Sequence, residues 1–264
     1  MSDTDALGDR MKTYENLGVG PRLMSQLPVL ARIDGRAFHS FVRGLDRPFD
    51  ARLSKIMVEV TKELVKETGA LIGYTQSDEI SLCWHSTDRR SQIYFDGRTT
   101  KMVSQLSAQA TIRFYRKCLN LLPDVYADRL PTFDSRVWAV PTRQEAVNYF
   151  IWRERDATKN SISMAAQAIR KPGESLDGLH GGQLQEFMFQ RGINWNDYPS
   201  FFKRGTYVQR MRVSRAYTQE QIDKLPANHT ARTTPRPVYV RQVVAELSMP
   251  PFGATESVIF AEGP

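Results

Sequence analysis

The sequence lacks the features by which several large protein classes are identified. Its 264 residues include two cysteines, Cys83 and Cys118, too few for a disulfide scaffold. The four histidines show no metal-ligand spacing, and there is no zinc signature. No stretch approaches the length of a membrane span, and the first residues form neither a basic n-region nor an apolar h-region. We therefore expect a soluble, cytoplasmic protein with no membrane partner.

Common nucleotide-binding and hydrolase motifs are also missing. The chain has no Walker loop, no Rossmann glycine fingerprint, no zincin motif and no nucleophile elbow. The usual sequence signals of ATPases, dehydrogenases, metalloproteases and serine hydrolases are thus absent. Positive charge is in excess, because 36 Lys and Arg residues against 29 Asp and Glu residues give a net charge of +7. This excess favours an anionic partner without naming it.

Two acidic sites are embedded in strand-like apolar sequence. Asp34 lies in the run Ala-Arg-Ile-Asp-Gly-Arg-Ala-Phe-His, and Asp78 with Glu79 lies in Gly-Tyr-Thr-Gln-Ser-Asp-Glu-Ile-Ser. Burying an unpaired charge is costly, so such carboxylates normally have a partner or a metal. Two Mg²⁺ ions about 3.5–4 Å apart, held by carboxylates, can catalyse nucleotidyl transfer. The sequence therefore predicts a catalytic site of Asp34, Asp78 and Glu79, with Asp34, Gly35 and Asp78 as metal ligands.

Each acidic site alone has a simpler interpretation. Asp34 would cap a helix that begins near Arg36, and Asp78-Glu79 would be a solvated turn. The presence of both sites, in the order strand, helix, strand, strand, favours the metal site. Gly35 would also let a phosphate approach the backbone, and a short helix from Phe38 would favour an anion at its N-terminus.

The hydrophobic pattern predicts an α+β fold of the ferredoxin-like βαββαβ type. It has strands at 28–33, 70–75, 80–84 and 132–140, and helices capped by Asp50 and spanning 100–119. Both helices would cover one face of an antiparallel sheet and leave the other face free for substrate.

The chain would divide near residue 140. Residues 1–140 would form the catalytic domain, with an N-terminal helix at 6–15. Residues 141–264 would add a long helix at 143–169, a short helix near 184–190 and strands near 206–213 and 238–247. This second part would pack on the first and not be independent.

Basic residues gather in two places. Lys101 and three arginines lie near the start of the second long helix, where cations oppose the helix dipole unless an anion binds nearby. Lys203, Arg204, Arg210 and Arg212 could follow an RNA backbone along a strand. Plain solvation of the first group and a basic edge strand for the second remain equally simple alternatives.

Five segments resemble motifs of the tRNA-histidine guanylyltransferase family, in the family's order and approximate spacing. They are Asp34-Gly-Arg-Ala-Phe-His39, Tyr74-Thr-Gln-Ser-Asp-Glu79, Phe133-Asp-Ser-Arg136, Tyr149-Phe-Ile-Trp-Arg153 and Lys203-Arg-Gly-Thr206. The match covers roughly residues 6–215. The resemblance implies a polymerase palm domain with a helical and β C-terminal elaboration, and an enzyme that adds nucleotides in the 3′-to-5′ direction to an RNA 5′ end. It also implies a homotetramer.

The same resemblance assigns roles to residues. Asp34, Gly35 and Asp78 would hold two Mg²⁺ ions, and ATP and GTP or other nucleoside triphosphates would be substrates. The nucleotide-site positions of the family fall on Gly35, Arg36, Ala37, Phe38, His39, Arg47, Ser77 and Lys101. Arg47 stands where the family usually has a lysine.

One departure from the family pattern bears on specificity. Eukaryotic members carry His-Ile-Asn-Asn after the Trp-Arg segment, whereas this chain has Thr158-Lys-Asn-Ser161. That motif accompanies obligatory addition of one unpaired G to tRNA-histidine, and without it the chain resembles the bacterial, archaeal and phage members of the family, which favour template-directed addition and can repair truncated tRNA 5′ ends. The resemblance implies template-directed addition, either for 5′-end repair or for G addition to tRNA-histidine. The alternatives are a palm-type nucleotidyl cyclase, which would need no RNA, and a non-catalytic RNA-binding protein.

Overall fold

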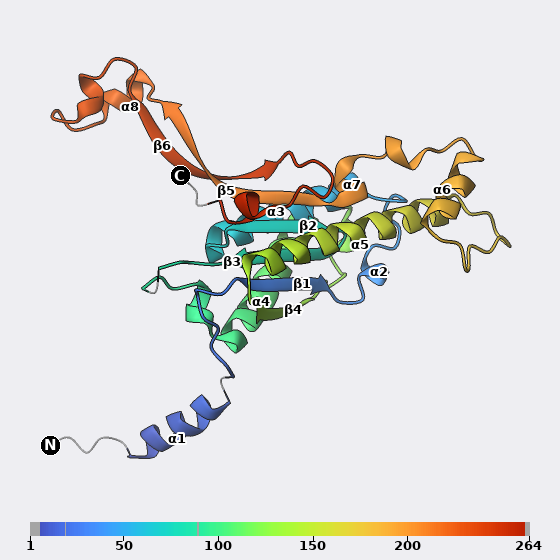
Figure 1. Ribbon diagram of the computed structural model, residues 1–264, viewed down its shortest axis with the longest axis horizontal. Helices are drawn as coiled ribbons and strands as arrows, with labels where there is room; N and C mark the ends of the chain where they lie inside the picture. Colours follow the sequence, from blue (N-terminus) through green and yellow to red (C-terminus); the bar gives the residue numbers. More distant parts are fainter. Residues whose placement is uncertain (1–5, 19, 89, 262–264) are drawn as a thin grey trace.

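A six-stranded antiparallel sheet forms the centre of the protein in this computed structural model, which describes residues 6–18, 20–88 and 90–261 (Figure 1). The strand order is β4-β1-β3-β2-β5-β6. The strands are β1 (Val29–Gly35), β2 (Ile72–Gln76), β3 (Glu79–Trp84), β4 (Phe133–Ala139), β5 (Thr206–Ala216) and β6 (Val238–Leu247).

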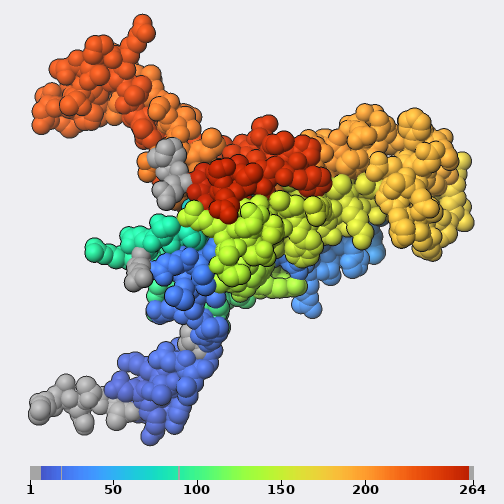
Figure 2. All heavy atoms as spheres, viewed as in Figure 1, coloured from blue at the N-terminus to red at the C-terminus, as the bar shows by residue number. Residues whose placement is uncertain are grey.

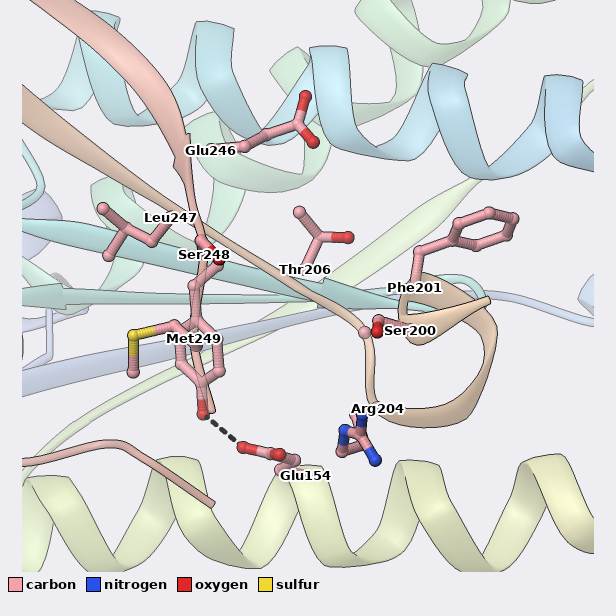
Figure 3. Close-up of a pocket in the computed structure, with 11 residues that line it drawn as sticks. Glu154, Ser200, Phe201, Arg204, Thr206, Glu246, Leu247, Ser248 and Met249 are labelled. Carbon is pink, nitrogen blue, oxygen red and sulfur yellow. Dashed lines mark hydrogen bonds between the residues drawn. The ribbon is translucent and has the colours of Figure 1, made fainter. Parts of the chain in front are cut away.

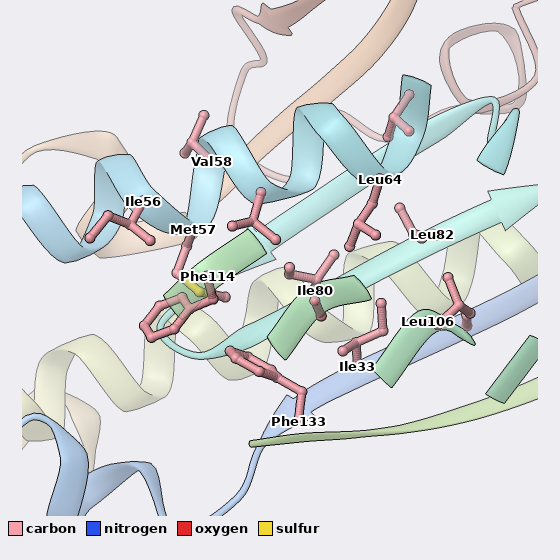
Figure 4. Packing of buried hydrophobic residues seen from close by; sticks show 14 of the residues in the cluster. Ile33, Ile56, Met57, Val58, Leu64, Ile80, Leu82, Leu106, Phe114 and Phe133 are labelled. Atoms are coloured by element: carbon pink, nitrogen blue, oxygen red, sulfur yellow. The ribbon is translucent and has the colours of Figure 1, made fainter. Parts of the chain in front are cut away.

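The first four strands have the predicted ferredoxin-like order. Helix α3 (Ala51–Thr68) joins β1 to β2, and α4 (Thr99–Leu121) joins β3 to β4. Helix α3 begins at Asp50, whose side chain accepts backbone hydrogen bonds from the first turn, and it ends at Gly69, whose φ of 72° is easy only for glycine. Both helices pack on one face of the sheet, where Ile33 and Phe114 lie in a large apolar core (Figure 4). The βαββαβ prediction is confirmed.

The opposite face of the sheet is covered by α5 (Arg143–Ile169), which crosses the central strands (Figure 1). Leu30 and Ile72 point to this side and pack with Val147 and Phe150 of the helix. The expectation that this face is free for substrate is therefore wrong, because its central strands are apolar on both sides and both sides must be buried. Beyond the sheet, α5 continues into a third apolar cluster, which it forms with α6 and α7.

Two elements project from the body. They are α1 (Ala6–Leu17) and the distal part of the β5–β6 hairpin, which carries α8 near its tip (Figures 1 and 2). The remaining helices are short: α2 (Phe38–Phe41), α6 (Gly181–Phe189), α7 (Ser200–Arg204), α8 (Gln219–Asp223), α9 (Glu256–Ile259), and the 3-10 turns η1 (Tyr94–Gly97), η2 (Asp124–Tyr126), η3 (Trp195–Asp197) and η4 (Thr230–Arg232). Within the described ranges, no helix has the length and apolar character needed to cross a bilayer.

Most predicted elements agree with the structure to within a few residues. Glu79 is the first residue of β3 rather than part of the turn, and the strand predicted to end at 213 continues to Ala216. Strand β5 pairs with β2, so residues after 140 complete the same sheet. The division at residue 140 stays a prediction.

Candidate active site

Strand register brings the two acidic sites together at one end of the sheet. Strand β1 lies antiparallel to β3, with Asp34 opposite Glu79. The turn between β2 and β3 then places Asp78 beside the end of β1, where the N–H of Gly35 donates to the carbonyl oxygen of Asp78 over 3.2 Å. Asp34 and Asp78, distant in sequence, therefore become neighbours.

Gly35 is the residue that permits this close approach. A Cβ atom there would lie 2.9 Å from Oδ2 of Asp78 and 2.5 Å from the ring of Phe38. Both distances are shorter than a side chain tolerates, so glycine is required for packing. This requirement comes from the protein itself, in addition to any phosphate that the backbone receives.

The two carboxylates repel each other. Burial raises the pKa of Asp78 to about 6, and the negative charge of Asp34 adds to the rise. The side chain of Asp34 makes no hydrogen bond or ion pair with the described part of the chain. A divalent cation between the two carboxylates would remove this repulsion.

The donor set fits Mg²⁺ only if the substrate contributes. No group of three or more His, Cys, Asp or Glu side chains gathers in metal-binding geometry within the described residues. Asp34, Asp78 and the carbonyl oxygen of Gly35 are all hard oxygen donors. Mg²⁺ typically binds one or two carboxylates and fills its remaining positions with water and phosphate oxygens, so the set is sufficient for a nucleotide-dependent site.

Glu79 is already paired. Its two carboxylate oxygens accept hydrogen bonds of 2.7 and 2.6 Å from Arg153 of α5, and the side chains are only 7% and 6% exposed. Burial raises the pKa of Glu79, and the hydrogen bonds from Arg153 oppose the rise. Glu79 thus holds α5 on β3 rather than extending toward a third ligand position. Arg153 was not assigned from the sequence, although the motif Trp-Arg contained it.

Strand β4 adds charged residues that the sequence analysis did not assign to the site. Asp134 lies opposite Asp34, and Arg136 lies opposite Arg32. Residues directly opposite in a sheet share a face, so these four side chains lie together on the side that α5 covers. The alternation of exposed Asp134 and Arg136 with buried neighbours in the motif Phe-Asp-Ser-Arg was the available signal.

The predicted nucleotide residues are only partly brought together. Arg36, Ala37 and His39 are exposed directly after β1, Ser77 is exposed in the turn next to Asp78, and Arg47 is exposed in the loop that follows α2.

Phe38 and Lys101 are placed differently. Phe38 is buried, with its ring 5.4 Å from that of Phe114, so it is a core residue. Phe133, which lies opposite Gly35, donates its backbone N–H to the Thr111 hydroxyl of α4, and Lys101 lies ten residues earlier in the same helix, about 15 Å along its axis. The assignment of Lys101 to the nucleotide site stays a prediction.

The four predicted RNA-binding residues also differ in their surroundings. Lys203 is buried, and its ammonium donates to the carbonyl of Asn196 and lies 5.4 Å from the Trp195 ring, so it has a structural role. Arg210 donates to two carbonyl oxygens near the C-terminal end of α3. Arg212 is exposed on the projecting hairpin, and its side chain makes no hydrogen bond or ion pair with the described residues.

Arg204 lines a cavity of about 300 Å³ (Figure 3). Glu154 faces the same cavity, and its carboxylate accepts hydrogen bonds from the Tyr207 hydroxyl and the Phe252 backbone N–H. These hydrogen bonds join α5, β5 and the C-terminal segment on the side of the cavity where Glu154 lies.

Comparison with known proteins identifies the family. The family described as tRNAHis guanylyltransferase matches residues 8–141, which contain both carboxylates. The chain belongs to the tRNA-histidine guanylyltransferase family.

Solved structures and relatives agree with this family membership. A bacterial tRNA(His) guanylyltransferase-like protein in complex with ATP is 38% identical, with a TM-score of 0.71 over 78% of this chain and 87% of the other. Another such protein, in complex with GTP, is 31% identical, with a TM-score of 0.73 over 97% and 100%. The tRNA(His) guanylyltransferase of Saccharomyces cerevisiae is 29% identical over 77% of this chain and 91% of its own length. Like its family, the chain has a palm-like fold and is a nucleotidyltransferase.

Proposed function

We propose that this protein adds nucleotides in the 3′-to-5′ direction to the 5′ end of tRNA or tRNA-like RNA, directed by a template base on the opposite strand. The observation that carries the proposal is the pair Asp34 and Asp78, set against each other across Gly35 in a guanylyltransferase-family chain. The bacterial relatives bound to ATP and GTP support nucleoside triphosphates as substrates.

Asp34, Gly35 and Asp78 would hold two Mg²⁺ ions. When bound, Mg²⁺ lowers the pKa of an attacking hydroxyl and neutralises the departing phosphates. Arg36 directly after β1, His39 in α2 and Arg47 in the loop that follows α2 are exposed and would contact the nucleotide phosphates. Glu79, fixed by Arg153, would keep the turn that carries Asp78 in place.

The reaction would proceed in two transfers. The 5′-monophosphate of the RNA first attacks the α-phosphate of ATP and releases pyrophosphate, which leaves an adenylylated 5′ end. The 3′-hydroxyl of the incoming nucleoside triphosphate then attacks the RNA 5′ phosphate, and AMP leaves. Asp34 and Asp78 would orient both transfers, since each needs the same in-line arrangement of phosphorus and attacking oxygen.

The segment Thr158–Ser161 supports template direction. Ser161 is buried and its hydroxyl donates to the carbonyl of Thr158, while the indole N–H of Trp195 donates to the Ser161 hydroxyl. Ser161 therefore faces the third apolar cluster instead of a substrate. Because its hydroxyl is already hydrogen-bonded inside the protein, Ser161 is not available to recognise a guanine base. Pairing with a template base would therefore select the nucleotide.

Other residues support the proposed RNA contact, the proposed oligomer and the proposed location. The exposed Arg212 on the β5–β6 hairpin would contact RNA phosphates. Leu7, Met11 and Tyr14 form an exposed apolar face of α1, which supports an interface in a homotetramer. Cys83 and Cys118 are free thiols, as expected in the cytoplasm.

The deciding experiment uses labelled nucleoside triphosphates with a full-length tRNA and a tRNA lacking its first nucleotide, with each of the four bases placed opposite the gap. The parent should repair the gap according to the opposing base. The rate of nucleotide addition should fall at least ~100-fold in Asp34→Ala. The control Asp128→Asn, at an exposed carboxylate, should add nucleotides at the parent's rate. Mn²⁺ binding, measured by electron paramagnetic resonance, should weaken in Asp34→Ala independently of turnover.

Other outcomes would contradict the proposal. Incorporation of G whatever the opposing base would indicate a dedicated tRNA-histidine guanylyltransferase. A cyclic product from GTP alone would indicate a nucleotidyl cyclase, and RNA binding with no product of either kind would indicate a non-catalytic binding protein.

A further inference from the structure

Trp152 is an exposed aromatic residue beside the charged face of the sheet. It is 52% exposed, whereas Trp84 and Trp195 are at most 9% exposed. A large aromatic side chain in water has a cost unless something covers it, so its location and orientation indicate what it can receive.

The neighbours of Trp152 place it over β1 and β4. Tyr149, one helical turn earlier in α5, hydrogen-bonds Ser81 of β3 over 2.8 Å and packs 5.3 Å from Trp138 of β4. The Trp152 ring lies 6.0 Å from that of Tyr149. Ser81 is opposite Arg32 in the sheet, so this part of α5 lies at the level of the charged residues described above.

The next residue links Trp152 to the carboxylates. Arg153 is bound to Glu79, and Glu79 is opposite Asp34. The guanidinium carbon of Arg153 lies 4.4 Å from the centroid of the Trp152 ring, and Asp156 also accepts a hydrogen bond from Arg153. One face of the indole is therefore covered by a cation that is itself fixed, while about half of the side chain stays exposed.

We propose that the open face of Trp152 stacks on a nucleobase at the active site. Every base has a π-face, so a flat aromatic ring held in one orientation is a general platform for it. Asp156 follows one turn later on α5 and is partly exposed, so it offers a carboxylate oxygen to the edge of the same base. The base belongs to a nucleoside triphosphate or to the RNA end. This inference rests on the proposed function.

Trp152 could instead shield the Glu79–Arg153 ion pair from water, and this role requires different side-chain properties from stacking. Covering the Glu79–Arg153 ion pair needs bulk and apolar surface, which leucine also supplies. Stacking needs an aromatic ring, which phenylalanine supplies in part. Trp152→Leu and Trp152→Phe therefore form a matched pair.

The experiment measures equilibrium binding without turnover, in two arms: Mg²⁺–GTP, and a tRNA lacking its first nucleotide. We expect Trp152→Leu to bind at least one of these ligands about 10-fold more weakly, and Trp152→Phe to stay within about 3-fold of the parent. The arm that weakens identifies the source of the base. The ligand should also quench the intrinsic fluorescence of the parent, and this quench should be largely lost in Trp152→Phe. Both variants should keep the parent's Tm.

Three results would overturn the proposal. Trp152→Leu could bind both ligands as the parent does. Both variants could lose affinity and Tm together, which assigns Trp152 a role in folding rather than in ligand binding. Light scattering could show that Trp152→Leu changes the oligomeric state, which assigns the open face to a second copy of the chain. A parent that binds and quenches but adds no nucleotide would refute the proposed function and leave the stacking site in place.

Discussion

Replacing Arg153 with methionine removes the hydrogen bonds that compensate the buried carboxylate of Glu79. The two contacts measure 2.7 and 2.6 Å, and both side chains are less than a tenth exposed. Loss of one partner from a buried ion pair leaves an uncompensated charge and costs about 3–5 kcal/mol. At roughly 2–4 °C per kcal/mol for a chain of this size, the Tm of Arg153→Met should fall by about 6–20 °C.

Thermal and urea unfolding of two further variants separate the causes. The control is Arg113→Met, which breaks a 2.9 Å ion pair with Glu63 whose side chains are 27% and 38% exposed. Such a partly exposed pair is worth about 0–1 kcal/mol, so the Tm should change by less than roughly 4 °C. The double variant Glu79→Gln/Arg153→Met should recover much of the lost stability, because no charge remains buried.

Two results would refute this reasoning. The smallest expected gap between Arg153→Met (a fall of ~6 °C) and the Arg113→Met control (a fall of ~4 °C) is roughly 2 °C, so an Arg153→Met protein that unfolds closer to the control than this would show that the buried pair contributes no more than a surface pair. A double variant as unstable as Arg153→Met would show that the unpaired Glu79 charge is not the cause.

Three other changes test the geometry around the site. Gly35→Ala should displace Asp78, because the new Cβ would lie 2.9 Å from its Oδ2. The free energy of unfolding, measured by urea titration, should fall by about 1–3 kcal/mol, and nucleotide addition, measured by a gel assay, should be lost. Arg129 donates hydrogen bonds of 2.6 and 2.7 Å to the carbonyls of Phe41 and Arg43 and so holds the segment that leads from α2 to Arg47. Arg129→Ala should therefore raise KM for the nucleotide about 10-fold, a loss of roughly 1.4 kcal/mol, while KM for RNA is unchanged in steady-state assays. Arg212→Gln should weaken RNA binding and reduce the slope of log affinity against log salt by roughly 0.7–0.9, as expected for one lost phosphate contact, while GTP affinity measured by calorimetry stays unchanged. An unchanged slope would remove Arg212 from the RNA surface.

The sequence by itself determined the secondary structure and the two acidic positions. Asp50 and Gly69 set the ends of α3 through a side-chain cap and a left-handed residue, both local effects. Alternating and helical apolar patterns fixed the other main elements, and their order left few ways to form the sheet. Asp34 and Asp78 could be paired in advance because each follows an apolar strand in that order.

Only the tertiary structure decided which polar groups meet. The sequence predicted Glu79 as a catalytic carboxylate but could not show that its partner is Arg153 of α5. The sequence predicted Lys203 as an RNA-binding cation, but its ammonium donates to the carbonyl of Asn196 beside the Trp195 ring. Lys101 lies in α4 about 15 Å from the residue that bonds to the end of β4 at the site. Periodicity predicts whether a residue points inward, but the partner of a buried charge comes from distant segments. That choice depends on how the helices pack, which no local pattern specifies.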